Sequence, residues 1–199
     1  MSRLAIGFLF LVACGTATPV SPPPAAADLS WNDTGPLLEQ LRAAAEQARV
    51  PGVVEDIDLL RQKWGETTTA TTPAQYAESL NDDRDALVGG DAEQMRAAAE
   101  DLHLKASHCR AGAPWNELVT VQAHTKRDGA PVPGKQVMVC RRGWANVPSK
   151  WRPLRKLSSP AVGELSPGTY VFRVGGEAPS TQKIGGDGRP TYDFDLVIP

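Results

Sequence analysis

The sequence has few of the residues on which most metal and enzyme sites depend. Among its 199 residues are three cysteines and three histidines. It contains no Cys-x-x-Cys or His-x-x-x-His pair, and His103 and His108 would face different directions on one helix. A Gly-x-Ser-x-Gly elbow, a phosphate loop and a dinucleotide-binding fingerprint are also missing. We therefore expect no metal, no cofactor and no enzymatic activity.

A long apolar run is missing too. The longest comprises Leu4 to Ala13 and follows the basic Arg3. A membrane-spanning helix needs about 20 apolar residues, so this run is too short to span a bilayer. A positive residue followed by a short apolar run is typical of a secretory signal, so we interpret residues 1–13 as a signal peptide.

The apolar run ends in Leu11-Val12-Ala13-Cys14, which resembles the lipobox of bacterial lipoproteins. The resemblance implies cleavage before Cys14, attachment of a diacylglycerol and further acyl chains such as palmitate to that cysteine, and anchoring to a membrane. Gly15, rather than an aspartate, follows it, which in the enterobacterial sorting pattern favours the outer membrane or cell surface. The alternative is that Cys14 is an ordinary thiol after a signal-like run.

Residues 14–32 are interpreted as the lipidated cysteine and a tether. The stretch 16–27 is uncharged and rich in Pro, Ala and Thr, a composition typical of a semi-rigid linker. With Cys14 assigned to lipid, Cys109 and Cys140 remain. Since an exported protein reaches an oxidising compartment, we predict that these two form a disulfide.

Residues 33–112 show helical periodicity and predict four helices in two antiparallel hairpins. Each boundary has a local cause. We expect a first helix over Leu37–Arg49, a second from Pro51, a third from the capping-box pattern Thr72–Gln75 to Gly89-Gly90, and a fourth capped by Asp91.

Residues 113–199 change to an alternating pattern that predicts a β-sandwich of six or seven strands. The expected core positions share one side of each strand: Val119, Val121 and Ala123; Val137 and Val139; Tyr170, Phe172 and Val174; Tyr192, Phe194, Leu196 and Ile198. The fold class is therefore α+β, with helical hairpins packed on an antiparallel sandwich.

Two turn-rich segments of this region, Asp128–Gly134 and Leu165–Phe172, resemble those of prealbumin-like sandwiches. This group includes carboxypeptidase regulatory domains and Cna-B-type surface modules. The resemblance implies that the aromatic residues after the second turn pack inward. Some Cna-B modules contain a lysine–asparagine crosslink, but the last strand here offers Asp193 and Asp195 instead, so that bond is not expected.

Charge is divided unevenly along the chain. Residues 28–112 contain sixteen acidic and eight basic residues, and residues 113–199 contain seven acidic and twelve basic ones. Many of the basic residues surround two tryptophans, and this set forms our candidate ligand-binding loop: Arg141, Arg142, Trp144, Lys150, Trp151 and Arg152, with Arg155 and Lys156 following. One interpretation is a site for anionic glycan, lipid head groups or an acidic partner. The other is that the basic region packs internally against the acidic helices.

Together these patterns predict an exported, lipid-anchored envelope protein with a structural or interaction role. Its partners would be the membrane and an unidentified envelope protein or glycan. The alternatives are a cell-wall or surface glycan-binding module that uses the candidate loop, and an enzyme whose site is assembled from distant residues. Nucleic acid is not an expected partner, since the chain carries a net charge of −2.

Overall fold

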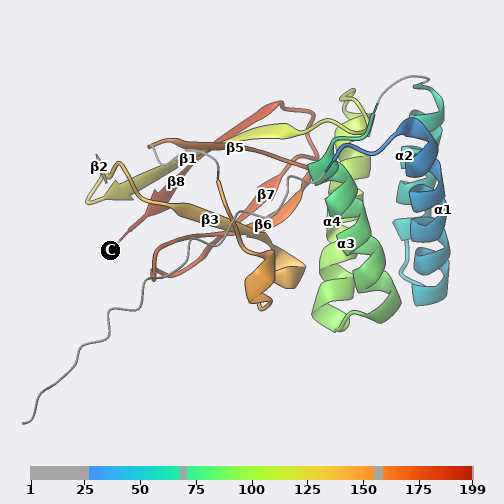
Figure 1. The fold of residues 1–199 in the computed structure, drawn as a ribbon, viewed down its shortest axis with the longest axis horizontal. Coiled ribbons are helices and arrows are strands. Elements are labelled where there is room, and N and C mark those ends of the chain that lie inside the picture. Colours follow the sequence, from blue (N-terminus) through green and yellow to red (C-terminus); the bar gives the residue numbers. More distant parts are fainter. Residues whose placement is uncertain (1–26, 68–70, 155–158, 199) are drawn as a thin grey trace, which may run out of the picture.

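The structure is a computed structural model that describes residues 27–67, 71–154 and 159–198. Within these residues four helices come first, and two β-sheets follow (Figure 1). The α+β prediction is therefore confirmed. The signal-like run, Cys14 and most of the predicted tether lie outside the described residues, as do Arg155 and Lys156.

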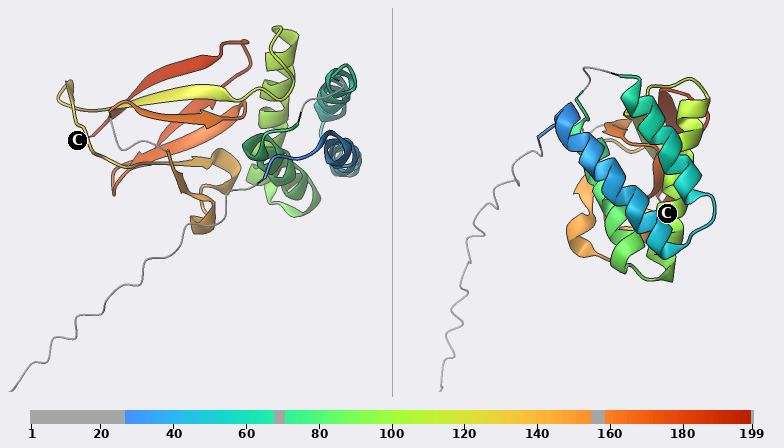
Figure 2. Two further views of the ribbon diagram at one scale, coloured as in Figure 1. Left: turned by 45° about the horizontal axis from the view of Figure 1, so that its top comes forward. Right: turned by 90° about the vertical axis from the view of Figure 1, so that its right-hand side faces the viewer.

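The helices form two layers (Figures 1 and 2). Helices α1 and α2 make the outer layer, and α3 and α4 lie against the sheets. The described bounds are α1 Trp31–Ala48, α2 Val53–Gly65, α3 Ala74–Gly89 and α4 Ala92–Arg110.

Helix α1 begins six residues earlier than the periodicity predicted. Ser30 caps it by accepting a hydrogen bond from the amide of Asp33. Pro36 therefore lies inside the helix rather than near its first residue. A polar cap outside the apolar stripe set the boundary, and the stripe alone could not reveal it.

The predicted position of the start of α3 was right, but the predicted capping of this helix was wrong. Pro73 is the N-cap, and no side chain caps the helix. The Thr72 hydroxyl bonds to Thr34 of α1 instead, at 2.7 Å. By contrast, Asp91 caps α4 as predicted and forms a full capping box with Gln94.

The helices enclose one apolar core. Leu38, Leu41, Ile57, Leu60 and Leu80 are among its fully buried members. At its sheet end, Tyr76 meets Trp115 edge-on, with ring centroids 5.7 Å apart. No helix in the described ranges is long and apolar enough to cross a membrane.

Eight strands follow in the described residues, two of them only two residues long. In chain order they are β1 Val119–Arg127, β2 Ala130–Pro131, β3 Val137–Arg141, β4 Arg152–Pro153, β5 Ala161–Leu165, β6 Gly168–Val174, β7 Ser180–Ile184 and β8 Thr191–Val197. Two 3₁₀ turns, η1 Arg142–Trp144 and η2 Pro148–Lys150, separate β3 from β4.

The strands form two four-stranded sheets. In one, β1 pairs with β2, β5 and β8; the other has the order β4-β3-β6-β7. All pairs are antiparallel except β1 with β8, which run parallel. The expectation of a purely antiparallel region was therefore wrong for β8, because alternation shows which residues face inward but not the strand direction.

Residues from both sheets share a second apolar core. The alternation predicted its membership well: Val119, Val121, Phe172, Leu196 and Ile198 are all buried. Phe194 is partly buried and meets Phe172 edge-on, with centroids 4.9 Å apart.

Candidate functional site at the interface of helices and sheets

The candidate loop lies where the sheets meet the helices. It runs from the end of β3 through η1 and η2 to β4, and η1 packs on α4. The loop therefore faces the acidic part of the chain. This is the internal packing that the charge division allowed as its second interpretation.

Arg141 reaches deepest into the interface and is 8% exposed. Its guanidinium donates hydrogen bonds to the carboxylates of Asp83 on α3 and Asp101 on α4, including one from Nε to Asp101 at 3.1 Å. It also donates to the Ser79 carbonyl oxygen at 2.6 Å. One side chain of the sheets thereby binds both inner helices.

Lys105 completes this buried cluster. It is fully buried, and its Nζ lies 2.9 Å from Asp83 Oδ2. Asp101 also accepts a hydrogen bond from the Thr169 amide of β6 at 2.6 Å. We call Asp83, Asp101, Lys105 and Arg141 the buried ionic cluster. Its two cations and two carboxylates balance, as buried charges must.

Burial and pairing oppose each other in the pKa values of this cluster. Burial lowers the pKa of Lys105, and the neighbouring Asp83 works against that shift. Burial raises the pKa of Asp101, opposed by Arg141 and Lys105. For Arg141, burial favours the neutral form, but Asp83 and Asp101 outweigh it and raise the pKa well above its usual value. Removing one partner would therefore leave an uncompensated buried charge.

The backbone at the start of β6 approaches the Asp101 carboxylate closely. A Cβ atom at Gly168, the first residue of β6, would lie 3.2 Å from the Asp101 carboxyl carbon. The glycine thus lets the Thr169 amide reach Asp101. The Pro167-Gly168 pair, expected to mark a turn, also makes room for this contact.

The other cations of the candidate loop form a rim of ion pairs around the cluster. Lys150 pairs with Asp82 at 2.6 Å, and Arg152 pairs with Glu78 at 3.0 Å. Arg142 pairs with Glu93 at 2.8 Å and Glu100 at 3.3 Å. All of these acceptors lie on α3 or α4.

Both tryptophans of the loop are partly buried and engaged by neighbours. Trp144 packs against the helical core, and Lys150 Nζ lies 5.0 Å from its ring centroid. Trp151 donates from Nε1 to the Ala145 carbonyl oxygen at 2.9 Å, while Arg173 covers its ring at 4.0 Å. Each indole therefore has a cation over its ring, and the neighbouring loop cations are paired with carboxylates of α3 and α4, which disfavours sugar stacking here.

A small cavity remains under the loop, lined by Ser79, Asp82, Cys140, Lys150 and Tyr170 among others. Its volume is about 20 Å³. That is room for about one water molecule and too little for a sugar ring. The contacts of the candidate loop therefore join the sheets to helices α3 and α4.

The predicted disulfide does not occur in the structure, where Cys109 and Cys140 are buried free thiols. Arg141, next to Cys140, contacts Asp101, which precedes Cys109 by eight residues on α4. Eight residues of helix rise about 12 Å, whereas bridged Cα atoms lie within about 7 Å. Burial raises the pKa of each thiol to about 11. The ionic cluster joins helices to sheets where the disulfide was expected to.

A second polar arrangement joins α2 and α4. His103 Nδ1 is 3.0 Å from the buried Asp56, and His103 Nε2 is 3.4 Å from the Ser107 hydroxyl. The order matches a catalytic triad, but catalysis also needs donors for an oxyanion. Ser107 lies within α4, whose amides are engaged in the helix, and the nearby Arg110 is held by Asp56 at 2.6 Å. The contacts therefore tie α2 to α4.

Asp83, Asp101 and Lys105 were not among the candidate residues predicted from the sequence, although all three are buried. The sequence did contain a pattern that could have indicated the burial of two of these residues. Asp101 and Lys105 are four residues apart and border the apolar stripe of Ala98, Leu102 and Ala106, so they share its buried side.

No group of three or more histidine, cysteine, aspartate or glutamate side chains that could hold a metal occurs in the described part of the chain. Comparison with protein-family models, curated proteins and solved structures finds no match to this chain.

Proposed function

We propose that this chain is a lipid-anchored protein of the bacterial cell envelope with a structural or interaction role rather than an enzymatic one. The observation that carries the proposal is Leu11-Val12-Ala13-Cys14 at the end of the apolar run. An acylated Cys14 would hold the folded part to a membrane surface, because each buried methylene of an acyl chain adds about 0.8 kcal/mol of membrane affinity.

The folded part supports a structural or interaction role. The cations of the candidate loop are paired with α3 and α4, and the cavity under the loop, at about 20 Å³, is too small for a sugar ring. A separate hollow of about 200 Å³ borders the loop at Arg152, whose cation is paired with Glu78. These contacts favour internal packing over the glycan-binding alternative. We keep the resemblance of about residues 117–198 to prealbumin-like sandwiches as a hypothesis of fold type, which favours presentation or binding over catalysis.

The anchor is tested by expressing the full chain in a bacterial host and measuring its intact mass after extraction from membranes. We expect a mass equal to residues 14–199 plus a diacylglycerol and additional acyl groups. Cys14→Ser should abolish this added mass and release the protein from the membrane. Cys140→Ser is the matched control, and it should keep both the lipid and the membrane location.

The choice between packing and glycan binding is tested by sedimentation with isolated cell-wall glycan. We expect no specific cosedimentation of the wild-type chain. Specific binding that disappears in Trp151→Ala, while the protein stays folded, would favour the glycan-binding module instead.

A further inference from the structure

Arg127 and Lys135 differ from the other basic residues of the sheet region. Neither has an ion pair, hydrogen bond or ring contact to its side chain in the described part of the chain. Every other basic residue described between positions 113 and 199 forms an ion pair or lies over an aromatic ring; Lys126, for example, pairs with Asp195 at 2.8 Å. The unpaired positive charge of this region is therefore concentrated in two residues.

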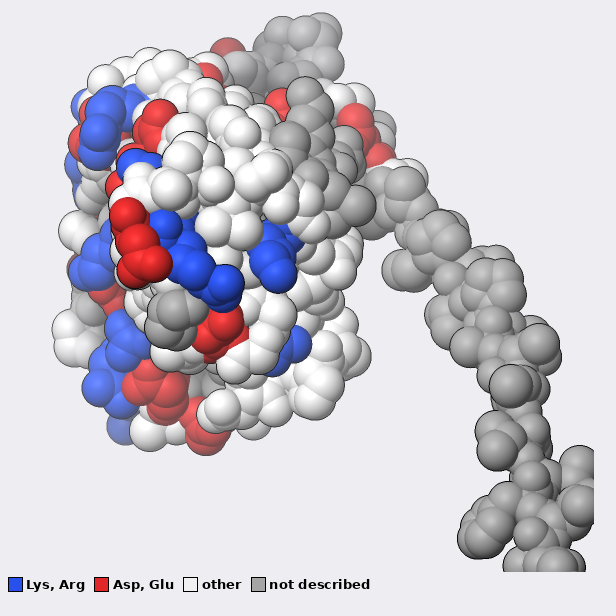
Figure 3. Space-filling view, turned by 90° about the vertical axis from the view of Figure 1, so that its left-hand side faces the viewer, with Lys and Arg blue, Asp and Glu red and all other residues white. Residues whose placement is uncertain are grey.

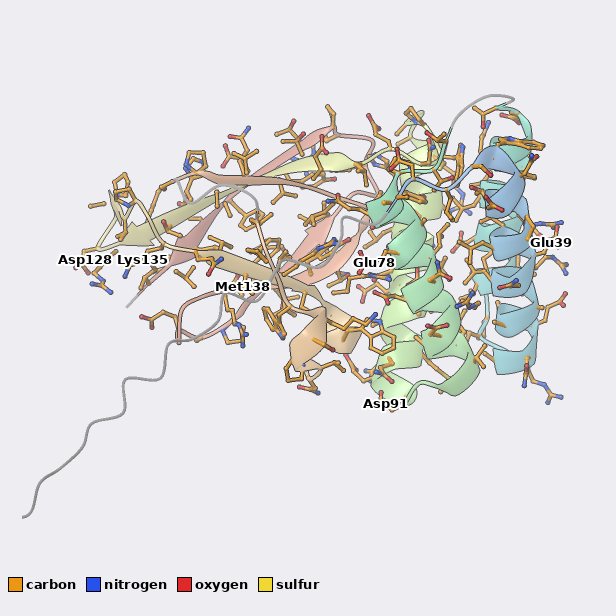
Figure 4. All side chains as sticks on the ribbon, in the orientation of Figure 1. Glu39, Glu78, Asp91, Asp128, Lys135 and Met138 are labelled. Carbon is orange, nitrogen blue, oxygen red and sulfur yellow. The ribbon has the colours of Figure 1, made fainter. Side chains whose placement is uncertain are left out.

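These two residues line the same hollow. It has a volume of about 170 Å³ and is also lined by Glu177, the turn Gly175–Gly176 and the apolar Val174 and Ile198. It lies at the end of the sheets farthest from the helices, where Lys135 is labelled in Figure 4. Figure 3 looks onto this end, whose middle presents basic side chains with acidic ones between them.

The walls leave the hollow open. Gly175 has a positive φ of 58°, which favours glycine, and a Cβ atom on Gly175 or Gly176 would meet nothing within 4 Å. Pockets for whole small-molecule ligands usually measure about 300 Å³ or more. A hollow of about 170 Å³ therefore suits a single end group rather than a whole ligand.

The charges specify what kind of end group fits. Arginine and lysine bind carboxylates through charge-assisted hydrogen bonds. Glu177 adds a carboxylate that no cation pairs with in the described part of the chain, so it can accept from an ammonium group. We propose that this hollow binds the free carboxylate and the free ammonium of an amino acid. The carboxylate would face Arg127 and Lys135, and the ammonium would face Glu177.

Calorimetric titration of the full chain in detergent tests this site. The probes are alanine, N-acetylalanine without the ammonium, alaninamide without the carboxylate, and phosphoethanolamine. We expect alanine to bind most tightly. Arg127→Gln and Lys135→Gln should each weaken alanine binding at least tenfold, and Lys126→Gln, whose cation lies outside the hollow, should leave it unchanged.

Glu177→Gln tests the ammonium contact separately, since it should remove the preference for alanine over N-acetylalanine. The proposal is overturned if alanine does not bind, if phosphoethanolamine binds more tightly, or if the Arg127 and Lys135 variants bind like the wild type. Because the hollow does not depend on the lipid, Cys14→Ser should bind alanine equally well.

Discussion

Arg141 is the residue through which a single substitution should disturb the molecule most. It compensates the charges of Asp83 and Asp101, each of which is only 1% exposed. Arg141→Met should therefore lower the free energy of unfolding by about 3–5 kcal/mol, the usual cost of breaking a buried ion pair from one side. Urea unfolding followed by circular dichroism measures this change.

Arg142→Gln is the matched control for Arg141→Met. Its ion pairs with Glu93 and Glu100 are partly exposed, and such surface pairs contribute about 0–1 kcal/mol. Equal losses in the two variants would contradict the distinction between buried cluster and solvated rim.

The buried thiols and Tyr170 predict a loss of stability in alkali. Burial raises the pKa of Cys109 and Cys140 from 9.0 to about 11, and that of Tyr170 from 10.0 to about 12. Because the folded state favours the neutral forms, their stabilisation is complete below pH 9 and is lost as the pH rises through 11 and 12. Unfolding free energies of the reduced protein between pH 8 and 12 should fall accordingly. A flat profile would contradict the burial of these groups.

Intact mass with and without reductant measures the state of the two cysteines directly. The structure predicts free thiols, which react with iodoacetamide only after unfolding. A mass two hydrogens lower before reduction would show that Cys109 and Cys140 pair as the sequence argument expected.

At the scale of elements, the capping box of α4 makes a measurable contribution. Asp91 accepts from the amides of Glu93 and Gln94, and Gln94 accepts from the Asp91 amide. Asp91→Ala should cost about 1 kcal/mol of stability, while Asp91→Asn, which keeps a capping oxygen, should cost much less. Thermal unfolding of both variants checks this, and similar losses for the two would mean that capping is not the cause.

The elements also show what the sequence could predict. Asp91, Gly89-Gly90 and the alternating apolar residues of β1 and β6 depend on local chemistry, so their prediction succeeded. The parallel direction of β8 depends on which strand lies beside it, and neighbouring residues do not encode that. The position of the candidate loop on α3 and α4 was one of two interpretations, and only the contacts could decide between them.

At the scale of the whole molecule, the helices and sheets should unfold together. Each part has its own apolar core, but the buried ionic cluster crosses the boundary and would be left unpaired if either part opened alone. Circular dichroism and tryptophan fluorescence should give coincident urea transitions. Two separated transitions in the wild-type protein would contradict a cooperative interface.

The uneven division of charge along the chain is explained by contacts between the helices and the sheets. The acidic residues of α3 and α4 meet the basic residues of the candidate loop, so much of the opposite charge is neutralised inside the molecule. The unpaired Arg127 and Lys135 lie at the other end of the sheets, where a partner could reach them. The sequence showed the surplus of charge but could not show which cations were free.

The proposed function depends above all on Cys14 anchoring this folded unit to a bacterial membrane. The most direct test is the intact mass of the protein extracted from membranes of a bacterial host. We expect a chain that begins at Cys14 and carries a diacylglycerol and further acyl groups. A chain cleaved elsewhere, or one beginning at Cys14 with an unmodified thiol, would contradict it.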